Sequence, residues 1–92
     1  MTVTLNELEY AGAMKFRFVE IDEDDYGPDG IDFVPNTVNL NRFQIVLVNV
    51  NDSTDATSAQ YFEDDEAIRA YDEGVELADG EDVSLSVVAI GR

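Results

Sequence analysis

The chain has 92 residues, of which 21 are acidic and five basic, and its formal net charge is −16 at neutral pH. This charge argues against nucleic acid and anionic membrane surfaces as direct partners, because both carry the same sign. The sequence contains no cysteine and no histidine, which argues against disulfides, thiolate chemistry, an ordinary zinc site and a histidine general base. The length fits a single domain over residues 1–92 with a thin apolar core.

Neither a membrane span nor a leader is expected. No apolar run approaches the length of a membrane span, and residues 1–10 lack the basic-then-apolar pattern of a signal peptide. We therefore expect a soluble protein without a visible targeting segment.

The first predicted strands lie at residues 2–5 and 14–21. In the second, the apolar side chains share one face up to Phe18 and lie on the opposite face from Val19 onward. A bulge or a crossing between two sheets would produce this change. After a turn-rich acidic loop, a short strand is expected at residues 31–34.

The strongest predicted strand spans residues 38–50. Between Phe43 and Val48 it is apolar on both faces apart from Gln44. Such a strand lies at the centre of a two-layer structure, which the pattern favours, or is buried against another chain. For the second case, the expected interface residues come from this strand and from the similar run near the C-terminus: Phe43, Ile45, Leu47, Val88 and Ile90.

The second half predicts further short strands, the first opening at Tyr61-Phe62 after a polar loop. Residues 64–73 fit either a short helix or, preferably, a strand at residues 68–71, because acidic residues would oppose the dipole at the helix C-terminus. Residues 75–77 and 83–90 read as a hairpin joined by an Asp-Gly turn. Together these patterns predict an all-β fold, a small Ig-like β-sandwich or barrel of about seven strands.

The acidic loop at residues 20–33 is the candidate for a metal site. Its spacing begins as in an EF-hand, but Tyr26 and Phe33 occupy positions where that calcium loop needs carboxylates. A hydrated acidic loop is preferred, because carboxylates are equally dense at residues 63–66 and 79–82. The alternative is a looser calcium site formed by Asp22, Asp24, Asp25 and Asp29.

No pattern predicts an enzyme. With 21 acidic residues some carboxylates must lie close together, so proximity alone does not indicate acid–base catalysis. No serine has a histidine partner or lies in a nucleophile-elbow pattern, and no glycine-rich phosphate loop is present. We therefore expect neither catalytic nor cofactor-binding residues.

Several segments of the chain resemble small β-sandwich accessory proteins of tailed viruses. The matching pieces are VLVNVN at residues 46–51, the DSTDATS loop, GVELADGE at residues 74–81 and VSLSVV at residues 83–88. The composition, with many acids and a single lysine, resembles that of proteins from salt-in haloarchaea and their viruses. These resemblances imply a virion component, a capsid decoration or cement protein or a head–tail accessory, without catalytic residues. Its partners would be other subunits in a symmetric oligomer, or capsid or tail proteins.

Two alternatives stay open. One is a small cytoplasmic binding module of a haloarchaeon, with a divalent cation in the acidic loop at residues 22–32. The other is weaker: the C-terminal segment resembles the last hairpin of ubiquitin-like sulfur carriers. Here the chain reads Gly91-Arg92 where a carrier has its diglycine, so the reactive group of the carrier is missing.

Overall fold

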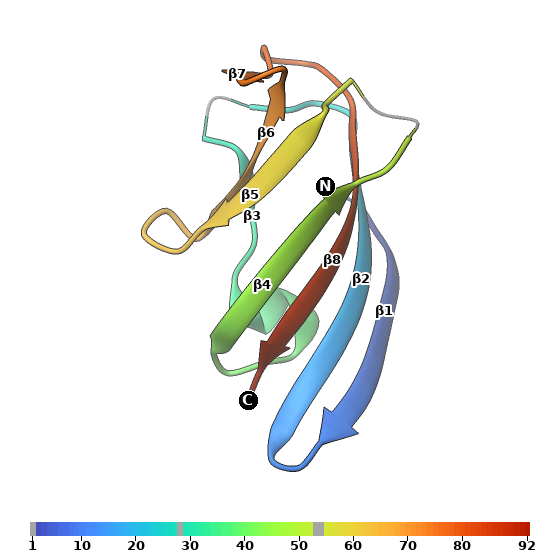
Figure 1. The fold of residues 1–92 in the computed structure, drawn as a ribbon, viewed down its shortest axis with the longest axis vertical. Helices are drawn as coiled ribbons and strands as arrows, with labels where there is room; N and C mark the ends of the chain where they lie inside the picture. Colours follow the sequence, from blue (N-terminus) through green and yellow to red (C-terminus); the bar gives the residue numbers. More distant parts are fainter. Residues whose placement is uncertain (1, 28, 53–54) are drawn as a thin grey trace.

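The computed structural model describes residues 2–27, 29–52 and 55–92 (Figure 1). Pro28 of the acidic loop and Ser53 and Thr54 of the polar loop lie outside the described residues. The described residues form eight strands and one short 3₁₀ helix: β1 (Thr2–Ala11), β2 (Met14–Glu23), β3 (Ile31–Asp32), η1 (Pro35–Val38), β4 (Phe43–Val50), β5 (Ser58–Phe62), β6 (Ala67–Asp72), β7 (Val75–Glu76) and β8 (Val83–Gly91). Within these residues no helix has the length and apolar character that crossing a bilayer requires.

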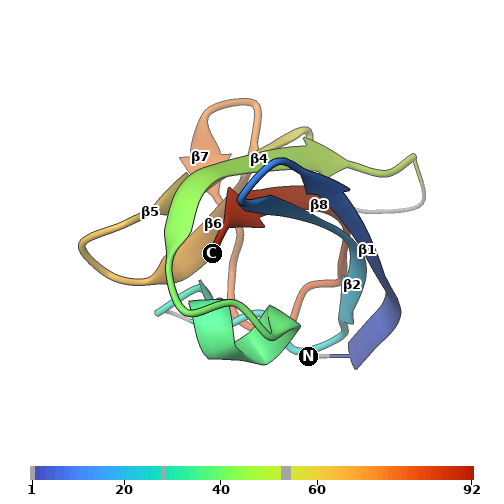
Figure 2. The ribbon, with the colours of Figure 1, turned by 90° about the horizontal axis from the view of Figure 1, so that it is seen from below.

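The strands form two antiparallel sheets, which confirms the predicted all-β fold. Sheet A has the order β1-β2-β8-β4, and sheet B has the order β3-β6-β5 with β7 paired to β6. The two sheets stack over one apolar interior, and η1 faces β8 across it (Figure 2). Residues 68–71, which fitted either a helix or a strand, belong to β6.

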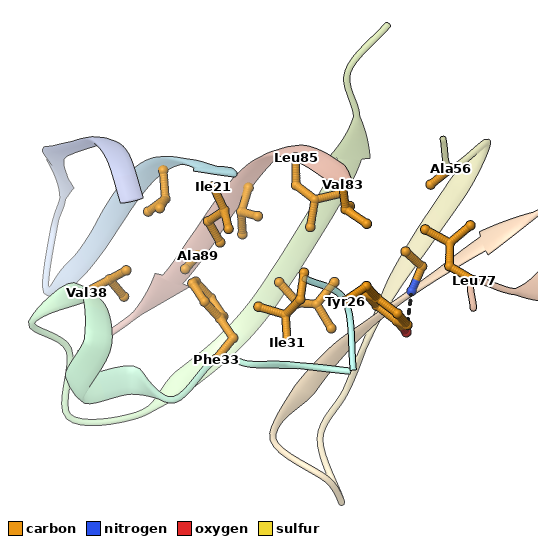
Figure 3. Close-up of a cluster of buried hydrophobic side chains, with 14 of the residues drawn as sticks. Ile21, Tyr26, Ile31, Phe33, Val38, Ala56, Leu77, Val83, Leu85 and Ala89 are labelled. Atoms are coloured by element: carbon orange, nitrogen blue, oxygen red, sulfur yellow. Dashed lines mark hydrogen bonds between the residues drawn. The ribbon is translucent and has the colours of Figure 1, made fainter. Parts of the chain in front are cut away.

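The core forms where the inner faces of the two sheets meet. Along β8 every second residue is buried, which is the period of two expected for a strand with one face inward. Figure 3 shows the resulting cluster, with side chains from both sheets and from the segments that join them. Its largest fully buried members are Tyr26, Phe33, Ile21, Ile68 and Leu85.

The predicted strand at residues 38–50 is shorter than expected and is not central. Pro35 opens the 3₁₀ helix η1, Asn39 ends it in the left-handed conformation with φ 61°, and β4 begins only at Phe43. Val38 is nevertheless fully buried, because η1 closes one end of the core. β4 lies at the edge of sheet A, so the central position that its apolar pattern favoured is wrong.

The predicted hairpin between residues 75–77 and 83–90 is also wrong. β7 pairs with β6 in sheet B, whereas β8 pairs with β2 and β4 in sheet A. After β7, the backbone N–H of Leu77 donates to the carbonyl of Ala70 at 3.0 Å, which keeps the chain on sheet B. The Asp-Gly turn is then held by Tyr26, whose carbonyl accepts from Gly80 N–H at 2.8 Å. The turn therefore carries the chain from one sheet to the other.

Candidate interaction surface

In β2 the apolar side chains change from one face of the strand to the other after Phe18. The residues before this change lie on the outer face of sheet A. β2 pairs with β8 one residue for one residue, from Lys15 opposite Gly91 to Glu23 opposite Val83, so β2 contains no bulge and no crossing between sheets. Both expected explanations of the change are therefore wrong. Sheet A is apolar on both faces: Val19 points inward and is 2% exposed, whereas Phe18 points outward and is 36% exposed.

Six apolar side chains form two rows across this face. Residues opposite each other in an antiparallel pair share a face, so the register defines the rows. One row contains Ile45, Ile90 and Phe16, and the next contains Leu47, Val88 and Phe18. Leu47 is 59% exposed and Ile45 is 49% exposed. We call these six residues the outer patch; a shallow groove of about 270 Å³ runs over part of it.

Acidic and polar side chains border the outer patch on two sides. Across β1, Glu9 lies opposite Phe16 and Glu7 opposite Phe18, so both rows end in exposed carboxylates. The neighbouring row along the strands contains Asn49, Ser86 and the exposed carboxylate of Glu20. Asn51 contacts the serines of β8. The Asn51 amide donates to Ser84 Oγ at 3.1 Å and accepts from Ser86 Oγ at 2.9 Å.

Two arginines lie at the remaining end of the outer patch. The backbone N–H of Arg42 donates to the carbonyl of Arg92 at 3.1 Å, and that of Arg92 donates to the carbonyl of Arg42 at 3.2 Å. This pair follows directly on the row that contains Ile45 and Ile90. Both arginines are exposed. Arg92 comes directly after the last residue of β8, two residues beyond Ile90.

Four of the five predicted interface residues belong to the outer patch: Ile45, Leu47, Val88 and Ile90. The expectation that Phe43 shares their face is wrong. The β4–β8 register shifts between Phe43 and Ile45, which turns Phe43 inward. Its ring stacks on Phe33 at 5.2 Å between centroids and meets Tyr61 edge-on at 5.6 Å. Sequence reasoning missed Phe16 and Phe18 as patch residues, although the change of side after Phe18 was the available indication.

A second recess runs beside the start of β4. It has a volume of about 600 Å³ and lies between the β4 edge and the β5–β6 turn. Arg42 and Gln44 line one side, and Tyr61, Glu63 and Glu66 line the other. Its polar, mixed-charge lining contrasts with the apolar outer patch.

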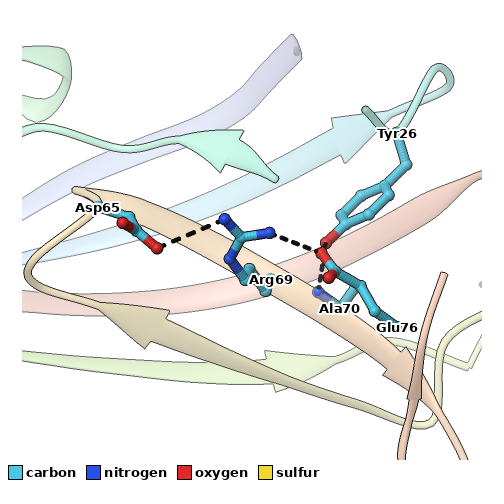
Figure 4. Close-up of polar contacts among 5 residues, drawn as sticks. All are labelled: Tyr26, Asp65, Arg69, Ala70 and Glu76. Atoms are coloured by element: carbon cyan, nitrogen blue, oxygen red, sulfur yellow. Dashed lines mark hydrogen bonds and ion pairs between the residues drawn. The ribbon is translucent and has the colours of Figure 1, made fainter. Parts of the chain in front are cut away.

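The acidic loop is anchored in the core through Tyr26. The Tyr26 hydroxyl donates to Glu76 Oε2 at 2.6 Å and accepts from the backbone N–H of Ala70 at 3.1 Å (Figure 4). Arg69 donates from Nη1 to the same Glu76 oxygen at 3.0 Å and also pairs with Asp65 at 3.4 Å. The network joins the loop to β6 and β7 of sheet B.

The network shifts the pKa values of its members. Burial, and then the hydrogen bond to Glu76, raises the pKa of Tyr26 to about 12. The hydrogen bond from Tyr26 holds the pKa of Glu76 below its ordinary value, although partial burial opposes it. Arg69 lowers it further. The hydroxyl therefore stays protonated and the carboxylate stays ionised at neutral pH.

The carboxylates proposed as calcium ligands are Asp22, Asp24, Asp25 and Asp29. Across residues 2–27, 29–52 and 55–92, no three acidic side chains gather in a group suited to a metal ion. The calcium site remains a prediction.

Comparisons with family models, with curated proteins and with solved structures find no match for this chain.

Proposed function

We propose that the protein is a non-enzymatic structural protein that acts through protein–protein contacts made by the outer patch of sheet A. The exposed outer patch carries this proposal. An antiparallel sheet that faces water usually alternates apolar-in with polar-out, whereas sheet A is apolar on both sides of β2, β4 and β8. Covering side chains as exposed as Leu47 and Ile45 would contribute roughly 1 kcal/mol each.

The setting that we propose is a virion of a haloarchaeal virus. The resemblance to virus accessory proteins supports a capsid decoration, cement or head–tail accessory role, and the acidic composition supports a particle assembled at high salt. Such a protein needs a robust contact surface and no active site. Apolar contacts suit this setting, because salt screens charge–charge interactions but does not weaken apolar burial.

The second candidate is a small cytoplasmic haloarchaeal binding module with a divalent cation in the acidic loop. The anchoring of the loop through Tyr26 favours it, because an ion bound there would be coupled to the core. This candidate predicts a monomer in molar KCl whose melting temperature rises with calcium and falls with chelator.

The solution mass of three proteins tests the contact surface. We expect light scattering in molar KCl to give a discrete symmetric oligomer for the wild type and a lower mass for Leu47→Ser. The matched control is Val75→Ser, which removes an apolar side chain that is even more exposed, at 72%, from β7 in the other sheet. The control should keep the wild-type mass, and circular dichroism should show all three folded.

Two results would contradict the proposal. One is a wild type that stays monomeric at every concentration in molar KCl, which would favour the binding module. The other is an equal loss of mass in Leu47→Ser and Val75→Ser, which would place the contact elsewhere.

A further inference from the structure

We infer that the outer patch binds a second copy of this chain, with the two A sheets packed face to face and crossing at nearly a right angle. This inference rests on the proposed function and specifies its partner. It follows from the charges around the outer patch and from the area that the face offers.

The outer patch is the place where two such acidic chains can approach each other. Residues 43–51 and 83–91, which contain β4 and β8, include no charged residue in a chain of net charge −16. Two copies that meet over these strands bring no carboxylates together at the centre of the contact. Elsewhere, the repulsion between copies opposes association.

Charged groups border the patch on three sides, and one of them is the exposed carboxylate of Glu20 in the polar row next to Phe18. Glu7 and Glu9 flank it across the strands, on β1. Arg42 and Arg92 flank it along the strands, beyond Ile45 and Ile90. A partner fits this border if it places basic groups against Glu7 and Glu9 and acidic groups against the two arginines. A second copy of the chain does so in one orientation.

The position of the two-fold axis decides which charges meet. An axis parallel to the strands would bring the arginine end of one copy to the arginine end of the other. An axis perpendicular to the strands would lay β1 over β1, so that Glu7 and Glu9 would face their own counterparts. Only an oblique axis, which lies between these two directions, brings the arginine side of one copy over the glutamate side of the other. By symmetry this contact between the arginines and Glu7 and Glu9 forms twice.

An oblique axis makes the strands of the two sheets cross at close to a right angle. Orthogonal crossing is one of the two common ways in which sheets pack. Four strands about 4.8 Å apart then overlap in a square roughly 20 Å on a side. Counting both copies and the relief of the side chains, the buried area reaches the low end of specific interfaces, about 1,000 Å². We therefore expect a reversible dimer of micromolar affinity.

Charge reversal on each side of the contact tests this arrangement. One variant carries Arg42→Glu and Arg92→Glu, and the other carries Glu7→Lys and Glu9→Lys. Each alone should dimerise at least about tenfold more weakly than the wild type in dilute salt, because both symmetry-related contacts become repulsive. An equimolar mixture should recover the wild-type affinity as a heterodimer, since both contacts are then attractive. Sedimentation velocity with one variant labelled measures this directly.

A matched control separates local pairing from net charge. Asp72→Lys with Asp79→Lys changes the net charge by the same amount, from −16 to −12, at two exposed positions away from the outer patch. Mixed with the arginine-reversed variant, this control should not recover the dimer. Recovery with the control, or its absence with the Glu7/Glu9 variant, would overturn the arrangement.

The outcomes also separate this inference from the proposed function. If Leu47→Ser lowers the solution mass but the charge-reversed mixture does not recover, the contact surface stands and the crossed two-fold dimer is wrong. If the wild type is monomeric, both fail. In molar KCl the effect of charge reversal should shrink while the effect of Leu47→Ser persists, because salt screens only the charges.

Discussion

Tyr26 shows how a residue in a highly acidic loop can serve the core. Its ring is fully buried, and its hydroxyl fills two hydrogen-bonding roles at once, as donor to Glu76 and as acceptor from Ala70. The surrounding carboxylates suggested a solvated loop, whereas Tyr26 and the pairing of β3 with β6 fix it to sheet B. A buried aromatic ring with a satisfied hydroxyl gains apolar burial without leaving a polar atom unpaired.

Removing this hydroxyl tests the anchoring. Tyr26→Phe keeps the ring but leaves the buried Ala70 N–H without an acceptor, so we expect a loss of about 1–3 kcal/mol in the free energy of unfolding. Urea unfolding in molar KCl measures it. Tyr10→Phe is the control, because it removes a hydroxyl from a side chain that is 67% exposed and should change little. Equal effects in the two variants would show that the network contributes nothing.

The Glu76 carboxylate makes part of the stability dependent on pH. Because its pKa is lowered in the folded state, its contribution is complete above the ordinary carboxyl pKa, about 4.3, and is lost as the pH falls through the folded value. The melting temperature of the wild type should therefore drop more steeply in acid than that of Glu76→Gln. Parallel curves for the two proteins between neutral and acidic pH would contradict this prediction.

At the scale of single elements, Gly91 permits the bulge that separates Phe43 from Ile45. A Cβ atom at Gly91 would collide with the carbonyl oxygen of Arg42 and would also lie 3.2 Å from the Phe43 Cα atom. We expect Gly91→Ala to cost about 1–3 kcal/mol of stability, because backbone rather than a flexible side chain must move. Thermal unfolding measures the loss. Gly74→Ala is an unsuitable control, because the φ of 88° at Gly74 would itself strain an alanine. Ala59→Ser, on the other sheet, serves instead and should be tolerated better.

The elements differ in how far the sequence could predict them. Alternation along β8 placed its inner face correctly, because a strand with one buried face has a period of two. Along β2 it did not, because the apolar side chains change faces after Phe18. The pairing of β7 and β8 was not predictable, since an Asp-Gly turn looks the same whether it closes a hairpin or leads to the other sheet. The bulge at Phe43 was equally invisible, because it depends on contacts between Gly91 and a distant strand.

Four of the six residues of the outer patch could be predicted from the sequence. Ile45, Leu47, Val88 and Ile90 stood out because apolar residues ran without interruption through their segments. Phe16 and Phe18 were visible too, but their exposure depends on β2 being continuous and on β8 lying beside it. Apolar alternation identifies a face of a strand, and only the strand order decides whether that face meets the core or the solvent.

At the scale of the whole molecule, the charge of −16 opposes the compact state. Many carboxylates lie exposed over both sheets, so folding brings like charges closer than they are in the unfolded chain. At molar ionic strength the screening length falls to about 3 Å, which removes most of this repulsion. We expect molar KCl to stabilise the protein by about 2 kcal/mol or more, which for a domain of this size raises the melting temperature by roughly 8–16 °C.

A variant with fewer charges tests whether repulsion causes this dependence. Neutralising four exposed acids, with Glu63→Gln, Asp64→Asn, Asp72→Asn and Asp79→Asn, changes the net charge from −16 to −12. Its melting temperature in dilute salt should exceed that of the wild type, and the two should converge in molar KCl, because screening removes the difference between them. If the melting temperatures of the two proteins instead rise in parallel with KCl concentration, the stabilisation comes from stronger apolar burial, which acts on both proteins alike. The fold would then be salt-tolerant by virtue of its core, and its acidic surface would serve solubility alone.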